Sequence, residues 1–313
     1  MSEQKKLNII KSILGEFYNK SDEYLFYCPK CDHHKKKLSV NFSKNVFKCW
    51  VCDWSGRDTY RIVRRYGDYH SKKEWRAFDQ QVEVGNFFEK LYEKAEIEKA
   101  QKIELPDEFI SLANKNLPKG SLYPLNYLRS RGVNKKDIIA WKIGYCSSGK
   151  YAGRVVVPSF DNDGDVNYFI TRSYDHNWKK YLNPGVSRNI VFNHLYLDFE
   201  QELTIVEGVF DAIKAGDNSV PLLGSTLTEN SKLFYEIVKN DTPVYLALDP
   251  DAERKINKVI KLFLKHDVEI YKVGVIPYQD VGEMPKEEFI RRKEKAILLD
   301  SNSYLLRRIS EIQ

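Results

Sequence analysis

Four of the five cysteines form two Cys-x-x-Cys pairs, Cys28 with Cys31 and Cys49 with Cys52. Each pair presents two thiolates from one turn, and two such turns complete a tetrahedral sulfur cage. The spacing therefore predicts a zinc site; iron is the alternative metal, and two redox motifs or a chance pairing are the alternatives without a metal. A closed four-sulfur site leaves no position for a catalytic water, so the predicted zinc is structural. Cys146 stands alone and is expected to be a buried thiol.

Lysines and aromatic residues alternate around the cysteines. Such a pattern places charges that neutralise phosphate beside rings on which unpaired bases can stack. We therefore expect Lys48 and Trp50 to contact nucleic acid. Phe42 and Phe47 are better explained as core residues of a small antiparallel sheet.

Acidic residues follow three predicted strands of the second half of the chain. They are Glu207 and Asp211 after strand 203–206, Asp249 and Asp251 after strand 244–248, and Asp280 and Glu283 after strand 268–273. In a parallel sheet the carboxyl ends of the strands share one edge, where ligands bind. Clustered carboxylates repel one another unless divalent cations lie between them, so the three clusters predict a Mg²⁺ or Mn²⁺ site with Glu207, Asp249, Asp251 and Asp280 as its ligands. Taken singly, each acidic motif is better explained as a helix cap or a solvated loop.

The edge belongs to a region of the chain in which predicted strands and helices alternate. The expected elements are strands 203–206, 219–223, 244–248 and 268–273, separated by helices 210–215, 229–239 and 252–265. This alternation is typical of a parallel sheet covered by helices. Before it, the expected elements are helices 58–66, 86–102, 125–132 and 134–141 and a hairpin of strands 154–158 and 166–170.

The fold class expected is a multidomain α+β and α/β chain, in which an N-terminal β zinc ribbon precedes a mixed α/β core. We expect a zinc ribbon at 1–67, a charged helical linker at 68–104, the first half of the core at 105–200, the parallel-sheet subdomain at 201–285 and a C-terminal helical tail at 286–313. The connector is placed at 68–104 because its polarity outweighs its apolar stripe.

Composition excludes several classes of protein. The 313 residues are 42% hydrophobic, which suits two or three globular domains and not a disordered tail. No apolar run approaches the roughly 18 to 20 residues that span a bilayer, and the first residues lack a signal-peptide core. The sequence thus predicts a cytoplasmic protein with no membrane partner. A net charge of +6 permits a phosphate-rich partner without demanding one.

In this order the motifs resemble those of the DnaG-type DNA primases, whose catalytic core contains a TOPRIM domain. Residues 204–211 look like the first TOPRIM motif, 223–226 like the loop after its second strand, and Asp249 with Asp251 like its DxD metal ligands. Residues 127–133, 154–158, 171–172 and 180–184 resemble the segment that separates primases from other TOPRIM enzymes. The resemblance spans nearly the whole chain and looks nearest to the compact primases of large tailed bacteriophages.

The resemblance implies residue roles. Segment 105–200 would be the N-terminal subdomain of the RNA polymerase core and 201–285 the TOPRIM subdomain. Glu207 would bind metal or act in acid–base chemistry together with Asp249, Asp251 and Lys180. The residues expected to contact template or nucleotide phosphates are Arg131, Arg154, Arg172 and Lys180. The chain departs from the pattern at Gly282, where an acidic residue is frequent, and after Asp251, where Ala252-Glu-Arg-Lys255 stands in place of Ala-Gly.

The implied function is synthesis of short RNA primers on a single-stranded DNA template from ribonucleoside triphosphates. Zn²⁺ would be structural and Mg²⁺ or Mn²⁺ catalytic, with a replicative helicase as a further partner and the bacterial host cytosol as the location if a phage encodes the chain. Two alternatives stay open. One is another TOPRIM enzyme, a nuclease or topoisomerase, and the other is a catalytically inactive zinc-dependent protein that binds single-stranded DNA.

Overall fold

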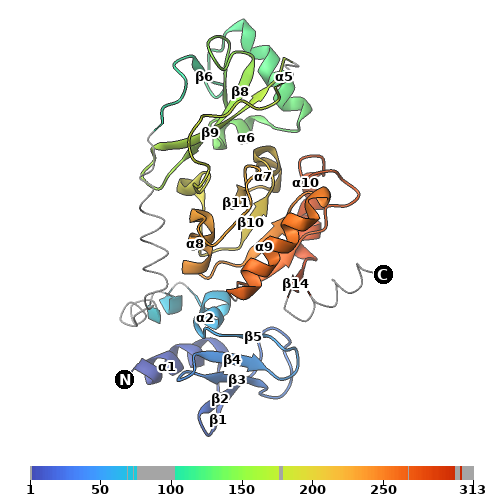
Figure 1. Ribbon diagram of the computed structural model, residues 1–313. Helices are drawn as coiled ribbons and strands as arrows, with labels where there is room; N and C mark the ends of the chain where they lie inside the picture. The colour runs from blue at the N-terminus through green and yellow to red at the C-terminus, as the bar shows by residue number, and fades with distance from the viewer. Residues whose placement is uncertain are drawn as a thin grey trace. The chain divides into compact units, whose positions relative to one another are not determined.

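The structure, a computed structural model, describes residues 2–68, 70–72, 74–75, 103–175, 179–266, 268–299 and 304. These residues divide into two compact units, one up to residue 75 and one from residue 103. The expected helix 86–102 lies outside the described residues. Figure 1 labels helices and strands of both units.

The N-terminal unit is built on an antiparallel sheet with strand order β1-β2-β3-β4-β5. Its strands are β1 (Tyr18–Lys20), β2 (Glu23–Phe26), β3 (Leu38–Asn41), β4 (Val46–Cys49) and β5 (Ser55–Gly56). Two helices, α1 (Ser2–Leu14) and α2 (Tyr60–Tyr66), contact each other beside it. The β zinc ribbon expected from the sequence is therefore confirmed as a fold, with helices added at both ends.

Helix α1 was not expected, and it enlarges the core of this unit. Leu7 and Ile10 lie one turn apart and are buried in one cluster with Phe26 of the sheet. Trp75 is 1% exposed and its ring lies 6.2 Å from that of Tyr60. The segment placed in a connector from residue 68 thus contributes to the N-terminal core.

The second unit begins with an antiparallel sheet of order β6-β7-β8-β9. Its strands are β6 (Phe109–Ser111), β7 (Gly144–Cys146), β8 (Arg154–Phe160) and β9 (Val166–Ser173); helices η1 (Lys119–Ser121), α5 (Leu122–Ser130) and α6 (Lys135–Ala140) lie between β6 and β7, and η2 (His194–Tyr196) follows β9. Gly164, at φ +86°, closes the hairpin expected at residues 161–164. Strand β9 runs three residues further than expected and so includes Arg172.

The second sheet has the order β11-β10-β12-β13-β14, and β10 to β13 are parallel. Its elements are β10 (Leu203–Val206), α7 (Val209–Ala215), β11 (Ser219–Pro221), α8 (Lys232–Lys239), β12 (Val244–Ala247), η3 (Pro250–Ala252), α9 (Glu253–Lys265) and β13 (Ile270–Lys272). The chain leaves β10 on one side to form β11 and returns on the other side as β12. The strand order therefore reverses between β10 and β12, which is where open parallel sheets bind ligands.

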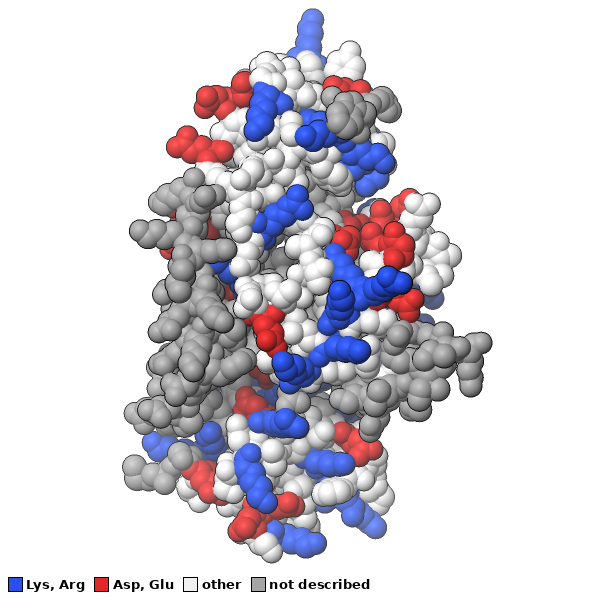
Figure 2. All heavy atoms as spheres, viewed as in Figure 1, with Lys and Arg blue, Asp and Glu red and all other residues white. Residues whose placement is uncertain are grey.

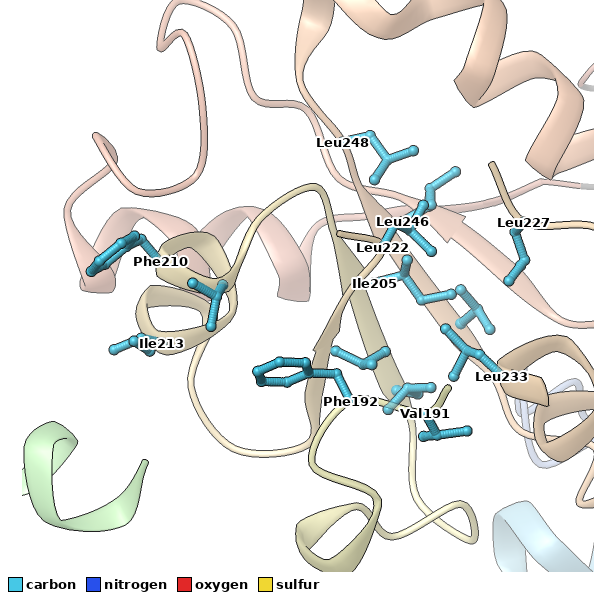
Figure 3. Packing of buried hydrophobic residues seen from close by; sticks show 14 of the residues in the cluster. Val191, Phe192, Ile205, Phe210, Ile213, Leu222, Leu227, Leu233, Leu246 and Leu248 are labelled. Carbon is cyan, nitrogen blue, oxygen red and sulfur yellow. The ribbon is translucent and has the colours of Figure 1, made fainter. Parts of the chain in front are cut away.

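Alternate residues of the central strands bury opposite faces of the sheet. Ile205 and Leu246 belong to the large core cluster that includes α8 and α9, and Figure 3 draws them close to Leu222, with Leu227 and Leu233 beside them. Val206 and Ala247 belong to a second cluster with Ala212 of α7 and Phe289. Helices thus cover both faces, and none among the described residues has the length and apolar character that a membrane crossing needs.

The segment after residue 285 differs from the helical tail expected there. Helix α10 (Lys286–Glu294) is followed by strand β14 (Ile297–Leu299), which pairs antiparallel with β13 through Tyr271 and Leu298. The apolar run Ile297-Leu298-Leu299 is too short for periodicity to separate strand from helix, and the open edge of β13 decides the outcome. Residues 305–313 lie outside the described residues.

Candidate functional site

The four paired cysteines lie together in the N-terminal unit. Their sulfur atoms are all within 4.8 Å of one another, with Cys28 Sγ 3.8 Å from Cys52 Sγ and Cys31 Sγ 3.9 Å from Cys49 Sγ. A tetrahedron with Zn–S bonds of about 2.3 Å has edges of about 3.8 Å. Among the described residues these thiols form the one group of three or more metal-ligating side chains gathered this closely. The geometry fits zinc, as the spacing predicted.

Both cysteine turns are followed by an aspartate in the left-handed backbone region. The residue after each pair, Asp32 or Asp53, has a positive φ of 45° or 54°. A hydrogen bond from Asp32 N to Cys28 O (3.0 Å) stabilises the first turn, and one from Cys49 N to Trp54 O (2.7 Å) stabilises the second. Aspartate tolerates this left-handed conformation better than most residues, so the sequence supports the two turns locally.

Lys48 and Trp50 lie on the surface beside this site. The Lys48 ammonium is 5.1 Å from the centre of the Trp50 ring and 3.3 Å from Asp53 Oδ1, and Trp50 is 63% exposed. A cation over an exposed ring is a fitting surface for an unpaired nucleotide. Phe42 and Phe47 are buried, as expected.

In the second unit the predicted carboxylates gather at the carboxyl edge of the parallel sheet. Glu207 follows β10 and Asp249 follows β12, the two strands that flank the reversal of strand order. Asp251 lies in η3, and Asp280 lies in the loop between β13 and α10. Val281, in that same loop, is fully buried and anchors it.

The charges at this edge interact strongly. Desolvation raises the pKa of Asp249 to about 7, with further contributions from Asp211, Glu207, Asp280 and Asp251. One oxygen of Glu207 (Oε2) and one of Asp249 (Oδ1) are buried without a hydrogen-bond partner among the described residues. Buried carboxylate oxygens left unpaired next to like charges are the donor set that a hard divalent cation prefers. The residues present therefore fit Mg²⁺ or Mn²⁺.

Asp211 holds the edge together. Its Oδ2 accepts a hydrogen bond from Gly208 N (2.9 Å) at the start of α7, and its Oδ1 accepts one from Gly282 N (2.8 Å) in the Asp280 loop. Burial, followed by the charge of Asp280, raises the pKa of Asp211 to about 6. With both oxygens engaged, Asp211 positions the neighbouring segments; the sequence placed it beside Glu207 but did not assign it this role.

Lys255 was not expected at the site. Its Nζ lies 2.6 Å from Glu207 Oε1, and the two side chains are 15% and 24% exposed. Lys255 is the third residue of α9 and stands four residues after Asp251. The departure of residues 252–255 from the Ala-Gly pattern was the only sequence signal at this position.

Basic and aromatic side chains line the neighbouring surface of the same unit. The Arg131 guanidinium lies 5.4 Å from the Phe210 ring centre and its charge acts on Asp211. Arg172 donates from Nε to the Tyr127 hydroxyl (3.1 Å) and lies 4.7 Å from the ring centre of Tyr181. The structure thus brings Arg131 near the acidic edge, whereas the partners of Arg172 are Tyr127 and Tyr181. Lys180 is exposed.

Arg154 corrects one expectation from the sequence. Its side chain is 3% exposed, and it donates to the backbone carbonyls of Lys179 (2.6 Å) and Lys180 (3.2 Å). A buried guanidinium with these partners is not free to contact nucleic acid. Its place at the first residue of β8 makes it a support for the segment that carries Lys180.

These features define a class: a zinc ribbon joined to a TOPRIM-like core with an acidic sheet edge. No protein-family model matches the chain. Its sequence is similar to DNA primases of Mycoplasma genitalium (22% identity, 94% of this chain and 58% of that protein) and Campylobacter jejuni (26% identity, 79% and 48%). The chain therefore spans about half the length of these relatives.

The fold is also similar to solved primase structures. One is the Aquifex aeolicus primase with its zinc-binding and RNA polymerase domains (22% identity, TM-score 0.52, 94% of this chain and 84% of that one). Another is the DnaG primase catalytic domain bound to single-stranded DNA (17% identity, TM-score 0.53, 71% and 82%). In sequence and in fold the chain resembles the DnaG-type DNA primases. The expected nearness to phage primases stays a prediction.

Zinc removal tests the first site. Replacing Cys49 with Ala takes away one thiolate, and because zinc binding and folding of such a ribbon are coupled, we expect bound zinc and the thermal transition of the N-terminal unit to be lost. Atomic absorption and circular dichroism measure both. Cys146→Ala, which removes the buried thiol outside the cluster, should keep its zinc; zinc retained by Cys49→Ala would disprove the ligand set.

The raised pKa of Asp249 gives a pH prediction for protein loaded with zinc but without Mg²⁺. Because the folded-state pKa (about 7) exceeds the ordinary value of 3.8, protonated Asp249 stabilises the fold at low pH, and this stabilisation is lost as pH rises through 7. Asp249→Asn should therefore raise the free energy of unfolding by about 1–2 kcal/mol at pH 8, a value reduced for solvent screening, and by less at pH 5.

Urea titrations at the two pH values measure this difference. Asp163→Asn, in the exposed hairpin turn, serves as the matched control and should change stability equally at both. If Asp249→Asn raised the free energy of unfolding equally at pH 5 and pH 8, the surroundings of Asp249 would not raise its pKa.

Proposed function

We propose that the chain is a DNA primase that joins ribonucleoside triphosphates into short RNA primers on single-stranded DNA. The observation that carries this proposal is the acidic sheet edge, where Glu207 and Asp249 each hold a buried, unpaired carboxylate oxygen. The zinc ribbon on the same chain supports a nucleic-acid template as the substrate. The sequence relatives, which are named DNA primases, favour primer synthesis over other reactions of such a metal edge.

The catalytic roles divide between the acidic edge and the basic surface. Glu207, Asp249, Asp251 and Asp280 would hold Mg²⁺ or Mn²⁺, which would neutralise charge on the triphosphate and on the leaving pyrophosphate. Phosphoryl transfer needs mainly positioning and charge neutralisation, so no side chain has to act as a nucleophile.

Arg131, Arg172 and Lys180 would bind triphosphate or template phosphates. The aromatic rings beside two of them hold their guanidinium groups in place and offer faces for bases. Arg154 would act indirectly, by fixing the backbone that carries Lys180.

The zinc ribbon would bind the single-stranded DNA template through Lys48 and Trp50. On the face drawn in Figure 2, basic and acidic side chains are interspersed, so on that face template binding would depend on a few such positions. A replicative helicase is the further partner proposed, and the cytoplasm, that of a bacterial host if a phage encodes the chain, is the proposed location.

Primer synthesis tests the function directly. Zinc-loaded full chain is incubated with mixed single-stranded DNA, labelled ribonucleotides and Mg²⁺ or Mn²⁺. We expect products of a few to tens of nucleotides, and a loss of at least about a hundredfold for Asp249→Ala, because metal binding supplies several kcal/mol of transition-state stabilisation.

Asp163→Ala, an exposed carboxylate in the hairpin turn, should retain full synthesis. Equal synthesis by wild type and Asp249→Ala would remove the metal edge from the mechanism. DNA binding without any synthesis by the wild type, with or without an added helicase, would favour the inactive binding protein.

A further inference from the structure

Lys255 is the one cation in direct contact with the acidic edge among the described residues. Its ammonium lies 2.6 Å from Glu207 Oε1, in a contact that is largely screened from solvent on the lysine side. The other basic group that acts on the cluster, Arg131, does so through its charge on Asp211. Lys255 therefore supplies the closest positive charge to Glu207.

The position of Lys255 in its helix argues for a specific role. It lies in the first turn of α9, where the helix dipole disfavours a positive charge. Lys258, one turn further along, is exposed and has no such contact. A lysine at the positive end of a helix needs compensation, and the carboxylates opposite it provide that compensation.

The contact also occupies one oxygen of the carboxylate whose other oxygen is free for a metal. Glu207 Oε1 is bound by the ammonium, while Oε2 is buried without a partner. A divalent cation bound through Glu207 Oε2 and Asp249 Oδ1 would lie close to the Lys255 ammonium, because both cations would be on the same carboxylate. Two cations at that range repel each other strongly, which favours a state in which only one of them is bound.

We propose that Lys255 is a built-in counter-cation of the acidic edge, and that a divalent cation binds at Glu207 only by displacing its ammonium group. Without metal the ammonium reduces the repulsion among the carboxylates and keeps Glu207 in place. With metal the ammonium is released at the same edge, where it can reach the phosphates of a bound nucleotide. The inference rests on the proposed function, because it describes what occupies the proposed metal site before a metal binds.

Manganese binding measures the competition without nucleotide or DNA. Zinc-loaded wild type and Lys255→Met are titrated with Mn²⁺, and free Mn²⁺ is followed by electron paramagnetic resonance. Because the competing charge is gone, we expect Lys255→Met to bind Mn²⁺ about fivefold to tenfold more tightly. Lys258→Met removes the same charge from the same helix and should bind like wild type, and Lys255→Arg should stay weak.

A second measurement uses the wild type alone. Lys255 should react slowly with an amine-directed reagent, and its labelling, read by peptide mass spectrometry, should accelerate severalfold when Mg²⁺ is added. Lys258 should react equally with and without Mg²⁺. This readout stands even if Lys255→Met fails to fold.

The outcomes separate the inference from the function. The inference would be overturned if wild type, Lys255→Met and Lys258→Met bound Mn²⁺ with equal affinity, or if Mg²⁺ did not change the labelling rate of Lys255. If the ion pair were purely structural, Lys255→Met would lower the melting temperature without tightening Mn²⁺ binding. Absence of Mn²⁺ binding in wild type and Lys255→Met alike would overturn the metal edge as well. Tighter Mn²⁺ binding by Lys255→Met with no primer synthesis by wild type would support the counter-cation and count against the primase.

Discussion

Repulsion among carboxylates at one sheet edge is the constraint on which the second unit depends. The reversal of strand order between β10 and β12 brings Glu207 and Asp249 together, and burial then raises the cost of their charges. The surrounding structure offsets that cost in separate ways. Backbone amides of Gly208 and Gly282 bind Asp211, and an ammonium binds Glu207. What remains unpaired is the donor set of a divalent cation.

The ligands of the N-terminal unit differ from those of the acidic edge, and they separate the roles proposed for the two metals. Four thiolates form a closed soft site, which favours zinc and excludes a reacting water, whereas carboxylates at an open edge favour Mg²⁺ or Mn²⁺. The sulfur atoms already lie at the spacing of a zinc tetrahedron. In the proposed function the two sites could not exchange roles: the first would fix the surface that carries Lys48 and Trp50, and the second would provide the chemistry.

Features encoded over short stretches could be predicted from the sequence. The cysteine turns, the hairpin at 161–164 and strand β10 depend on neighbouring residues, and acidic residues after buried strands identified the edge. Features that depend on partners distant in sequence were missed. Helix α1 is recognisable once the ribbon exists to bury Leu7, and β14 forms because β13 offers an open edge. Arg154 looks like any cation until its carbonyl partners are known.

Two departures from the DnaG-type pattern change the charge of the edge in the same direction. Gly282 stands where an acidic residue is frequent, and a Cβ there would lie 3.1 Å from Asp211 Oδ1 and 3.2 Å from Asp280 Oδ1. Gly282 therefore brings only its backbone amide to the edge, and that amide donates to Asp211. Lys255 adds a positive charge beside Glu207. Both features make the edge less negative when no metal is bound. Under the proposed counter-cation role, that reduction lowers the affinity of the edge for a divalent cation in exchange for less repulsion among its carboxylates.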